Sequence, residues 1–195
     1  MTITKLTPDF SVPDEVLKLA SKIRMVLFDV DGVLTDGRLF FSDSGDETKS
    51  FHSRDGLGIN LLQESGVGVG IITARQSKLV AHRARDLNIQ HLYQGRKEKF
   101  PAYVELCETL QLSPEEVAFV GDDAVDLPIM LNVGLAITVP QGHRIVKERS
   151  HWTTPHEAGA GAARDVCELI MHAQGSYSKV MAQFLSSGST PAQLL

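Results

Sequence analysis

The sequence predicts an α/β fold built on a doubly wound parallel sheet of the Rossmann-like kind. Short apolar runs, each the length of a buried strand, alternate along the chain with longer segments in which apolar residues recur at helical spacing. Several of the short runs stop abruptly at polar residues, as central strands do where they deliver groups to a ligand site. This alternation favours a parallel sheet with helices on both faces.

The chain is expected to begin with a helix and then a buried strand. Segment 13–21 starts with Pro13, which suits a first helical turn, and its apolar residues share one helical face. Residues 23–28 form a mostly apolar run that stops at Asp29, as a central strand would. We therefore place a helical lead-in at 1–22 and the start of a globular domain at residue 23.

Four more strands and three helices are expected in this domain, which we extend over 23–174. Short apolar runs place the strands at 67–73, 91–93, 117–120 and 135–139. Helical spacing of apolar residues places the helices at 76–87, 97–110 and 124–132. The tail, 175–195, is rich in Ser, Gly and Gln with scattered apolar residues, and it need not belong to the core.

One segment, about 38–52, interrupts the alternation and predicts a β-hairpin inserted after the first strand. Two short runs with aromatic residues, 38–41 and 48–52, flank the turn-rich stretch 42–47. The hairpin is expected to lie over the edge of the sheet where a ligand would bind. Its strand edges and aromatic side chains call for a partner surface, such as another copy of the chain.

Composition argues against several classes of function. The formal net charge of −5 disfavours a protein that binds nucleic acid or coats an anionic membrane. No apolar stretch approaches the roughly 18 residues that a membrane span needs, so we expect a cytoplasmic protein that acts on small molecules. The two cysteines, Cys107 and Cys167, lie far apart in apolar helical patterns, which favours buried free thiols over a disulfide or a thiolate metal site.

Two carboxylates follow the first predicted strand. Asp29 and Asp31 are separated by one residue, and the period of two along a strand would point both side chains to the same side. Such a pair also occurs as helix caps or surface charge. The position beyond the carboxyl end of a strand favours a ligand site instead, because doubly wound sheets bind their ligands there.

Further polar groups follow the other predicted strands and point to a bound cation. Thr73 and Arg75 follow the second strand, just before a helix, where a hydroxyl and backbone N–H groups can hold phosphate oxygens. Segment 121–126 adds three carboxylates at the same edge, and these repel one another unless a cation is present. Oxygen ligands without a His or Cys cluster favour Mg²⁺, and Lys99 offers a compact positive charge for phosphoryl chemistry.

These residues resemble the four motifs of the haloacid dehalogenase superfamily of phosphohydrolases. The matching positions, in chain order, are DVDGVLT at 29–35, Thr73, Lys99 and GDDAVD at 121–126. The chain is most similar to the 3-deoxy-D-manno-octulosonate 8-phosphate (KDO 8-phosphate) phosphatases. That similarity, over about 23–175, rests on FDVDGVLTDG at 28–37, RDGLGI at 54–59, HLYQG at 91–95 and VGDD at 120–123. The chain departs from the family's usual pattern at Ala74, where the family has Gly.

The resemblance implies an enzyme that works through an aspartyl-phosphate intermediate. Asp29 would attack phosphorus, and Asp31 would donate a proton to the leaving oxygen and later take one from water. Mg²⁺ would be held by Asp29, the backbone carbonyl of Asp31, and Asp122. Thr73 and Lys99 would position the phosphate. Asp126 and Asp123 would hold Lys99 or metal-bound waters from outside the ligand set.

The same resemblance implies a substrate and an assembly. The expected substrate is KDO 8-phosphate, a precursor in lipopolysaccharide biosynthesis, with a nine-carbon 2-keto sugar acid phosphate as the alternative. Arg54 and Arg75 are candidates to bind it, together with Gly32 and Lys99, because a guanidinium can hold a carboxylate through two hydrogen bonds. The family lacks a large cap domain and forms homotetramers with composite sites, which predicts the same here.

A phospho-acceptor signalling domain is the alternative from a different class. It also gathers acidic residues, a Thr and a Lys around Mg²⁺ on a parallel α/β sheet. Asp31 argues against it, since an acid two residues after the nucleophile serves turnover, whereas a signalling domain keeps its aspartyl phosphate intact.

Overall fold

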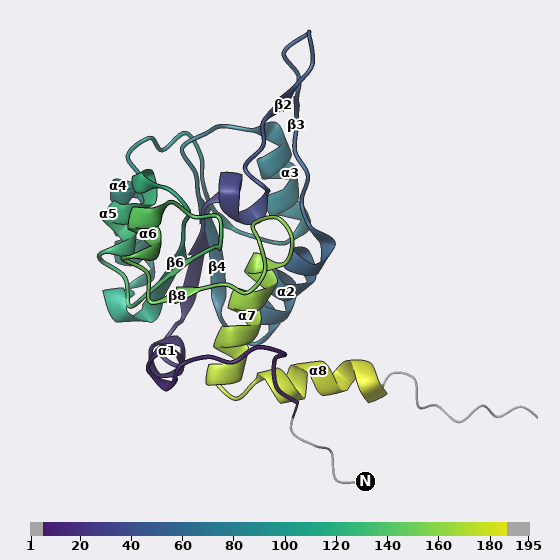
Figure 1. Ribbon diagram of the computed structural model, residues 1–195, viewed down its shortest axis with the longest axis vertical. Coiled ribbons are helices and arrows are strands. Elements are labelled where there is room, and N and C mark those ends of the chain that lie inside the picture. The colour runs from purple at the N-terminus through teal and green to yellow at the C-terminus, as the bar shows by residue number, and fades with distance from the viewer. Residues whose placement is uncertain (1–5, 187–195) are drawn as a thin grey trace, which may run out of the picture.

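A computed structural model of the chain describes residues 6–186 and contains the predicted parallel sheet (Figure 1). Six strands pair in the order β5-β4-β1-β6-β7-β8, and every neighbouring pair is parallel. Their bounds are β1 (Met25–Phe28), β4 (Gly68–Ile72), β5 (His91–Tyr93), β6 (Val117–Val120), β7 (Leu135–Thr138) and β8 (Trp152–Thr153). The doubly wound α/β fold is therefore confirmed.

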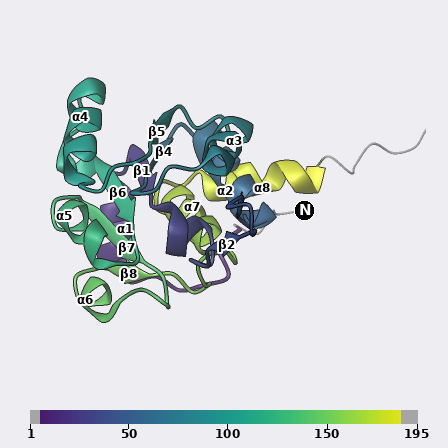
Figure 2. The same ribbon diagram turned by 90° about the horizontal axis from the view of Figure 1, so that it is seen from above.

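Helices cover both faces of this sheet, as Figure 2 shows in the view from above. One face carries α1 (Asp14–Ala20), α2 (Ser53–Glu64), α3 (Lys78–Asp86) and α7 (Ala162–Ala173). The other carries α4 (Phe100–Leu110), α5 (Leu127–Met130) and α6 (Arg144–Lys147). The described residues contain no helix long and apolar enough to cross a membrane.

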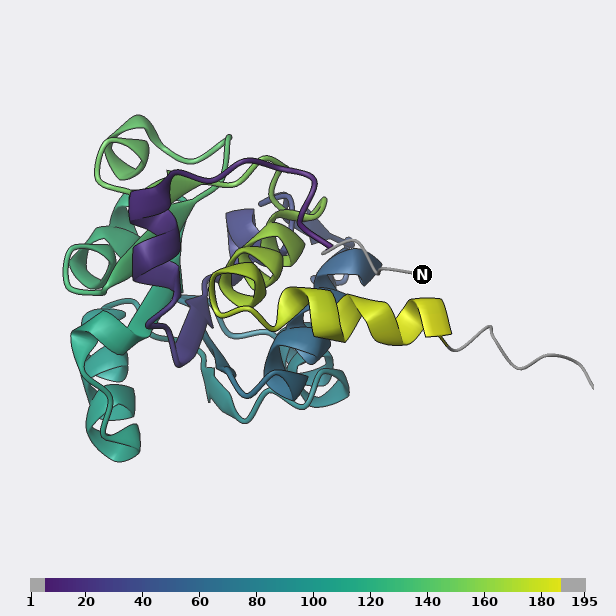
Figure 3. The same ribbon diagram turned by 90° about the horizontal axis from the view of Figure 1, so that it is seen from below.

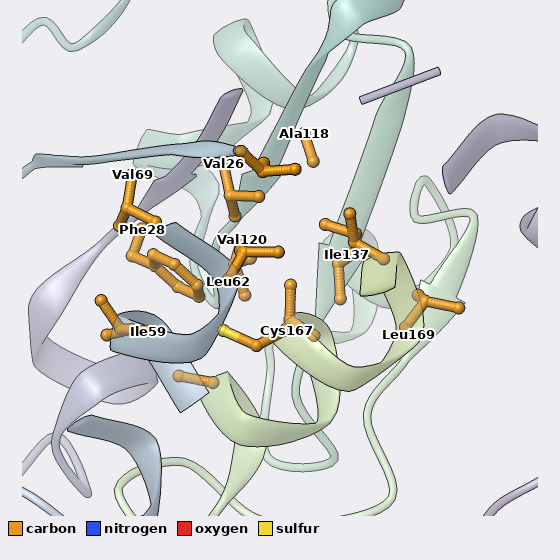
Figure 4. Close-up of a cluster of buried hydrophobic side chains, with 14 of the residues drawn as sticks. Val26, Phe28, Ile59, Leu62, Val69, Ala118, Val120, Ile137, Cys167 and Leu169 are labelled. Atoms are coloured by element: carbon orange, nitrogen blue, oxygen red, sulfur yellow. The ribbon is translucent and has the colours of Figure 1, made fainter. Parts of the chain in front are cut away.

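The core consists of two apolar layers, one on each face of the sheet. Strand β1 shows how one strand serves both layers: Val26 and Phe28 join the layer under α2 and α7, whereas Met25 and Leu27 join the layer under α4. Figure 4 shows Val26 and Phe28 among side chains of the first layer. All four residues are buried, so β1 appears in the sequence as an unbroken apolar run rather than as an alternating one.

Helices α2 and α7 are the main elements that the sequence patterns do not predict. In α2 the glycines Gly56 and Gly58 weaken the helical signal. The packing explains Gly58, because a Cβ atom there would lie 3.1 Å from the Cα of Arg164 in α7. The glycine lets the two helices approach closely, at a cost in intrinsic helix propensity.

Two predicted elements differ in form. Segment 124–132, expected as one helix, is a 3₁₀ turn (Ala124–Asp126) followed by the short helix α5. The chain after Gly175 forms helix α8 (Tyr177–Ser186), which follows α7 and extends away from the sheet (Figure 3). Within this helix Tyr177 is buried and joins the core layer under α2 and α7. Residues 187–195 of the tail lie outside the described residues.

The predicted hairpin is present but shorter than expected. Strands β2 (Phe40–Phe41) and β3 (Glu47–Thr48) pair antiparallel, with Phe41 opposite Glu47. Figure 1 shows the hairpin rising from the end of the sheet that carries the turn η1 (Val30–Leu34) after β1. Within residues 6–186 no larger insertion covers this end of the sheet.

Candidate active site

The candidate site lies at the carboxyl ends of β1, β4 and β6, three neighbouring strands. Asp29 follows β1, Thr73 follows β4, and Asp122 lies two residues after β6. The chain winds outward in both directions from β1, so this edge is the switch point at which doubly wound sheets bind ligands. Strand β1 ends at Phe28, so Asp29 and Asp31 both lie in the turn beyond it, and strand alternation does not set their directions.

Lys99 connects two of the carboxylates. Its Nζ atom lies 2.8 Å from Asp29 Oδ1 and 2.7 Å from Asp126 Oδ1, and its side chain is buried. Burial alone would lower the pKa of Lys99, but the two carboxylates raise it above its ordinary value, so the ammonium stays charged. Asp126 is held in turn by the backbone N–H groups of Asp122 and Asp123, which donate to Oδ2 at 3.0 and 3.2 Å.

Asp29, Asp122 and Asp126 form an acidic cluster whose carboxylate oxygens lie within 4.8 Å of one another. Burial, with Asp126 adding to it, raises the pKa of Asp29 to about 6 against the opposing effect of Lys99. Burial and the neighbouring carboxylates of Asp29, Asp126 and Asp123 raise the pKa of Asp122 to about 7. The crowded negative charge is thus only partly compensated by Lys99.

This cluster fits a hard divalent cation. Its ligand atoms are all oxygens, the donor type that Mg²⁺ prefers. Asp126 already accepts from Lys99 and from two backbone N–H groups, so Asp29 and Asp122 are the carboxylates available to a metal ion. The structure thus brings together the two carboxylates expected to hold Mg²⁺.

Gly32 allows the turn after β1 to approach Asp122. Its φ angle is +94°, and a Cβ atom built on it would lie 2.1 Å from Asp122 Oδ2. Any side chain at this position would be strained and would displace the Asp122 carboxylate. Gly32, expected among the substrate-binding residues, therefore lies directly against a candidate metal ligand.

Asp31 contacts one cation of the hairpin and one of the loop after β4. Its Oδ1 atom pairs with Lys49, and its Oδ2 atom lies 3.6 Å from Arg75 Nε. Glu47 Oε1 lies 3.3 Å from Lys49 Nζ and 3.2 Å from Arg75 Nη2. Burial raises the pKa of Glu47, but Ser77, Arg75 and Lys49 lower it by more, and the carboxyl stays ionised.

Sequence reasoning missed Glu47 and Lys49. Glu47 ends the predicted turn stretch 42–47 and Lys49 lies in the second predicted run, 48–52; their spacing of two would put both side chains on one face of an extended arm, but only if that arm begins one residue earlier than predicted. The hairpin as a whole was expected over the ligand edge of the sheet, but charged side chains in a hairpin usually point to solvent.

Three other residues expected at the site, Thr73, Asp123 and Arg54, differ in burial and in their partners. Thr73 is buried, and its Oγ1 atom accepts a long hydrogen bond, 3.4 Å, from the backbone N–H of Arg75. Asp123 is exposed and caps the following 3₁₀ turn through Ala124, and within the described part of the chain it forms no ion pair with Lys99. Arg54 is exposed in the first turn of α2 and pairs with no residue in the described part of the chain.

Comparisons with known proteins show the family to which this chain is related. Residues 88–165 match the family of haloacid dehalogenase-like hydrolases. The KDO 8-phosphate phosphatase of Yersinia pestis is 46% identical over 163 residues, which cover 84% of this chain and 87% of that protein. The phosphatase of the same name from Escherichia coli strain K12 is 42% identical over 172 residues, covering 88% and 92%.

A solved structure shows the same architecture. The KDO 8-phosphate phosphatase of Moraxella catarrhalis, solved in complex with magnesium, phosphate and a KDO molecule, superimposes with a TM-score of 0.86 at 38% identity. The match covers 88% of this chain and 98% of that one. With this identity over most of both chains, and with the acidic cluster at the switch point of the sheet, this chain belongs to the 3-deoxy-D-manno-octulosonate 8-phosphate phosphatase family of haloacid dehalogenase-like hydrolases.

Proposed function

We infer that this chain is a Mg²⁺-dependent phosphoric monoester hydrolase that converts KDO 8-phosphate to the free sugar acid and phosphate. The reaction would belong to the biosynthesis of lipopolysaccharide precursors. The observation that carries the chemistry is the arrangement around Asp29: a buried carboxylate 2.8 Å from the Lys99 ammonium, beside Asp122, with Asp31 two residues away. A nucleophile, a fixed positive charge and an acid are the groups that phosphoryl transfer through a covalent intermediate requires.

In the first step, a carboxylate oxygen of Asp29 forms a bond to phosphorus as the bond from phosphorus to the sugar oxygen breaks. The electron pair of the broken bond goes to the sugar oxygen, and Asp31, entering this step protonated, gives it a proton, so that a neutral alcohol leaves. Lys99 holds Asp29 in place and faces the phosphoryl oxygens with its positive charge. Thr73 positions the phosphate beside it.

In the second step, a water oxygen forms a bond to phosphorus as the bond from phosphorus to Asp29 breaks. Asp31, now a carboxylate, takes the proton of that water, which restores both aspartates and releases inorganic phosphate. Asp29, Asp122 and the backbone carbonyl of Asp31 would hold Mg²⁺, which supplies positive charge that offsets the phosphoryl oxygens. Asp126 keeps Lys99 oriented throughout, since its Oδ1 atom lies 2.7 Å from the ammonium.

The substrate proposal is supported by the family and by two arginines. The related phosphatases carry KDO 8-phosphate in their names, and the Moraxella catarrhalis protein was solved with a KDO molecule. Arg75 lies beside Asp31, and Arg54 presents an exposed guanidinium to bind a carboxylate. The test is phosphate release from a panel of sugar phosphates. KDO 8-phosphate should give the highest kcat/KM, above a nine-carbon 2-keto acid phosphate, and a neutral hexose phosphate preferred over both would contradict the proposal.

We also propose that the chain works as a homotetramer in the cytoplasm. The hairpin exposes three large apolar side chains, Leu39, Phe40 and Phe41, which are 45–57% exposed and suit a surface covered by another copy. The free thiols Cys107 and Cys167 are in line with a reducing compartment. Light scattering at micromolar concentration tests the assembly, and a monomeric mass would contradict it.

A further inference from the structure

Asp31 belongs to a closed ring of four side chains in which acidic and basic residues alternate. Going around the ring, Asp31 contacts Lys49, Lys49 contacts Glu47, Glu47 contacts Arg75, and Arg75 returns to Asp31. The members come from three separate segments: the turn after β1, the second arm of the hairpin, and the loop after β4. The ring therefore ties the hairpin to the catalytic edge of the sheet.

Glu47 is the member that lets the two cations share Asp31. Lys49 and Arg75 carry like charges and approach the same carboxylate, so they repel each other unless an anion lies between them. The side chain of Lys49 is only 1% exposed, and a cation this deeply buried needs partners for its charge. Glu47 contacts both cations and supplies a negative charge to them also when Asp31 carries the proton that it gives to the leaving oxygen.

The hairpin backbone fixes Glu47 in this place. Phe41 is the residue directly opposite Glu47 in the β2–β3 pair. The guanidinium carbon of Arg75 lies 5.8 Å from the centre of the Phe41 ring, so both members of this cross-strand pair contact Arg75. A shift of the hairpin would move Glu47 and Phe41 together and would release Arg75 and Lys49 from their positions.

We propose that Glu47 is a positioning residue for the phosphatase reaction, which holds Lys49 and Arg75 against Asp31 and thereby sets the direction of the carboxyl group that protonates the leaving oxygen. The inference rests on the proposed function. Glu47 touches neither the Asp29 carboxylate nor Lys99, so it acts on the proton transfer and not on the attack at phosphorus. Misplacing a catalytic group by about 1 Å costs on the order of a hundredfold in rate.

The test uses two esters that differ in their need for a proton. A sugar phosphate has a poor alkoxide leaving group and depends on Asp31, whereas p-nitrophenyl phosphate has a good leaving group and depends on it much less. Glu47→Gln keeps the shape and removes the charge. We expect kcat for the sugar phosphate to fall about 10- to 100-fold and kcat for p-nitrophenyl phosphate to fall less than about 3-fold.

The matched control is Asp46→Asn, which removes one negative charge from the same hairpin. Asp46 bonds only to Ser42 and Ser44 in the turn among the described residues, so this variant should keep wild-type rates on both esters. If Glu47→Gln unfolds at the assay temperature, Glu47→Asp, with its shorter reach, should show the same preference for the good leaving group.

The outcomes separate this inference from the function on which it rests. Equal losses on both esters, or no loss on either, would overturn the positioning role while wild-type activity still supports the phosphatase. A wild-type protein that releases phosphate from neither ester, with Mg²⁺ present, would overturn the proposed function, and the role of Glu47 would fall with it.

Discussion

At the scale of single residues, the reactivity of Asp29 depends on two opposing influences. Burial raises its pKa to about 6, which disfavours the carboxylate that must attack phosphorus. The Lys99 ammonium, 2.8 Å away, favours the carboxylate and limits this rise. The site thus keeps a poorly hydrated nucleophile that is still ionised at neutral pH, and poor hydration leaves its oxygen free to react.

Replacing Asp29 with Asn should abolish this chemistry and keep the fold. An amide cannot attack phosphorus, so kcat should fall by at least about a thousandfold in a phosphate-release assay. Lys99 keeps Asp126 as a partner at 2.7 Å, so the thermal unfolding temperature should stay close to that of the wild type. Activity that survives Asp29→Asn with Mg²⁺ present would show that another group is the nucleophile.

Replacing Gly32 with Ala tests how closely the turn after β1 packs against Asp122, and Gly66 serves as the control. Gly32→Ala introduces strain at φ +94° and a Cβ atom 2.1 Å from Asp122 Oδ2, so it should reduce both stability and activity. Gly66 has a similar φ angle, +97°, but a Cβ atom there would meet nothing within 4 Å, so Gly66→Ala should cost only the backbone strain, roughly 1–2 kcal/mol.

Thermal unfolding and phosphate release on both glycine variants check this prediction. Gly66→Ala should keep wild-type activity below its unfolding temperature, whereas Gly32→Ala should lose more than about tenfold. Equal activity in the two variants would mean that Asp122 tolerates displacement, contrary to its place in the cluster.

Residues of the site differ in how far the sequence reveals them. Asp29, Asp31 and Asp122 follow apolar strands, and the parallel topology brings such positions together without any knowledge of side-chain contacts. Lys49 and Glu47 were not predictable in this way, because the direction of the hairpin over the sheet follows from tertiary contacts with Asp31 and Arg75. Local patterns carry no information about such contacts.

At the scale of elements, strands were easier to predict than the helices packed on them. The bounds of β5 and β6 were predicted to the residue, since both are short apolar runs between polar segments. Helix α2 was missed because Gly56 and Gly58 mask its pattern, although Gly58 serves the close approach of α7. Tertiary packing selects residues there that local propensity would reject.

The place of Arg54 at the start of α2 makes it a candidate for substrate recognition. Its side chain is exposed and has no partner within residues 6–186, so its guanidinium is available to a carboxylate. Arg54→Ala should lower kcat/KM for KDO 8-phosphate by about 10- to 100-fold, in line with the roughly 1.5–3 kcal/mol of a charged hydrogen bond. Hydrolysis of p-nitrophenyl phosphate should change much less.

Arg149 gives a matched control for Arg54. It is also exposed and follows α6, so Arg149→Ala should leave both substrates unaffected. If Arg54→Ala lowers kcat/KM equally for KDO 8-phosphate and for p-nitrophenyl phosphate, Arg54 serves structure or phosphate binding and not carboxylate recognition.

At the scale of the whole molecule, the fold keeps an acidic cluster at the carboxyl edge of its central strands at some cost in stability. Burial and the nearby carboxylates raise the pKa of Asp122 from 3.8 to about 7. Between these values the folded chain binds more protons than the unfolded chain, so the free energy of unfolding falls as the pH rises through this window. Without metal, the stabilisation from the protonated Asp122 is fully present below about pH 4 and is lost above about pH 7.

We therefore predict opposite effects of Asp122→Asn without and with Mg²⁺. In metal-free buffer at pH 8 the variant should unfold at a higher temperature than the wild type, by about 2–8 °C, because it removes an unfavourable charge worth roughly 1–2 kcal/mol. At pH 5, where Asp122 is largely protonated, the two proteins should differ little. Adding Mg²⁺ at pH 8 should stabilise the wild type, since an ion that binds only the folded state shifts the equilibrium toward it.

The unfolding temperatures of the wild type and of Asp122→Asn are measured with and without Mg²⁺ at pH 5 and pH 8, and phosphate release is measured in parallel. The Mg²⁺-dependent rise should be smaller at pH 5 than at pH 8 in the wild type, because protons compete with the metal for the same carboxylates. In Asp122→Asn the rise and the activity should both be largely lost. An equal Mg²⁺-dependent rise in the variant at pH 8 would mean that the ion binds elsewhere, and Asp122 would then owe its raised pKa to crowding that no metal relieves.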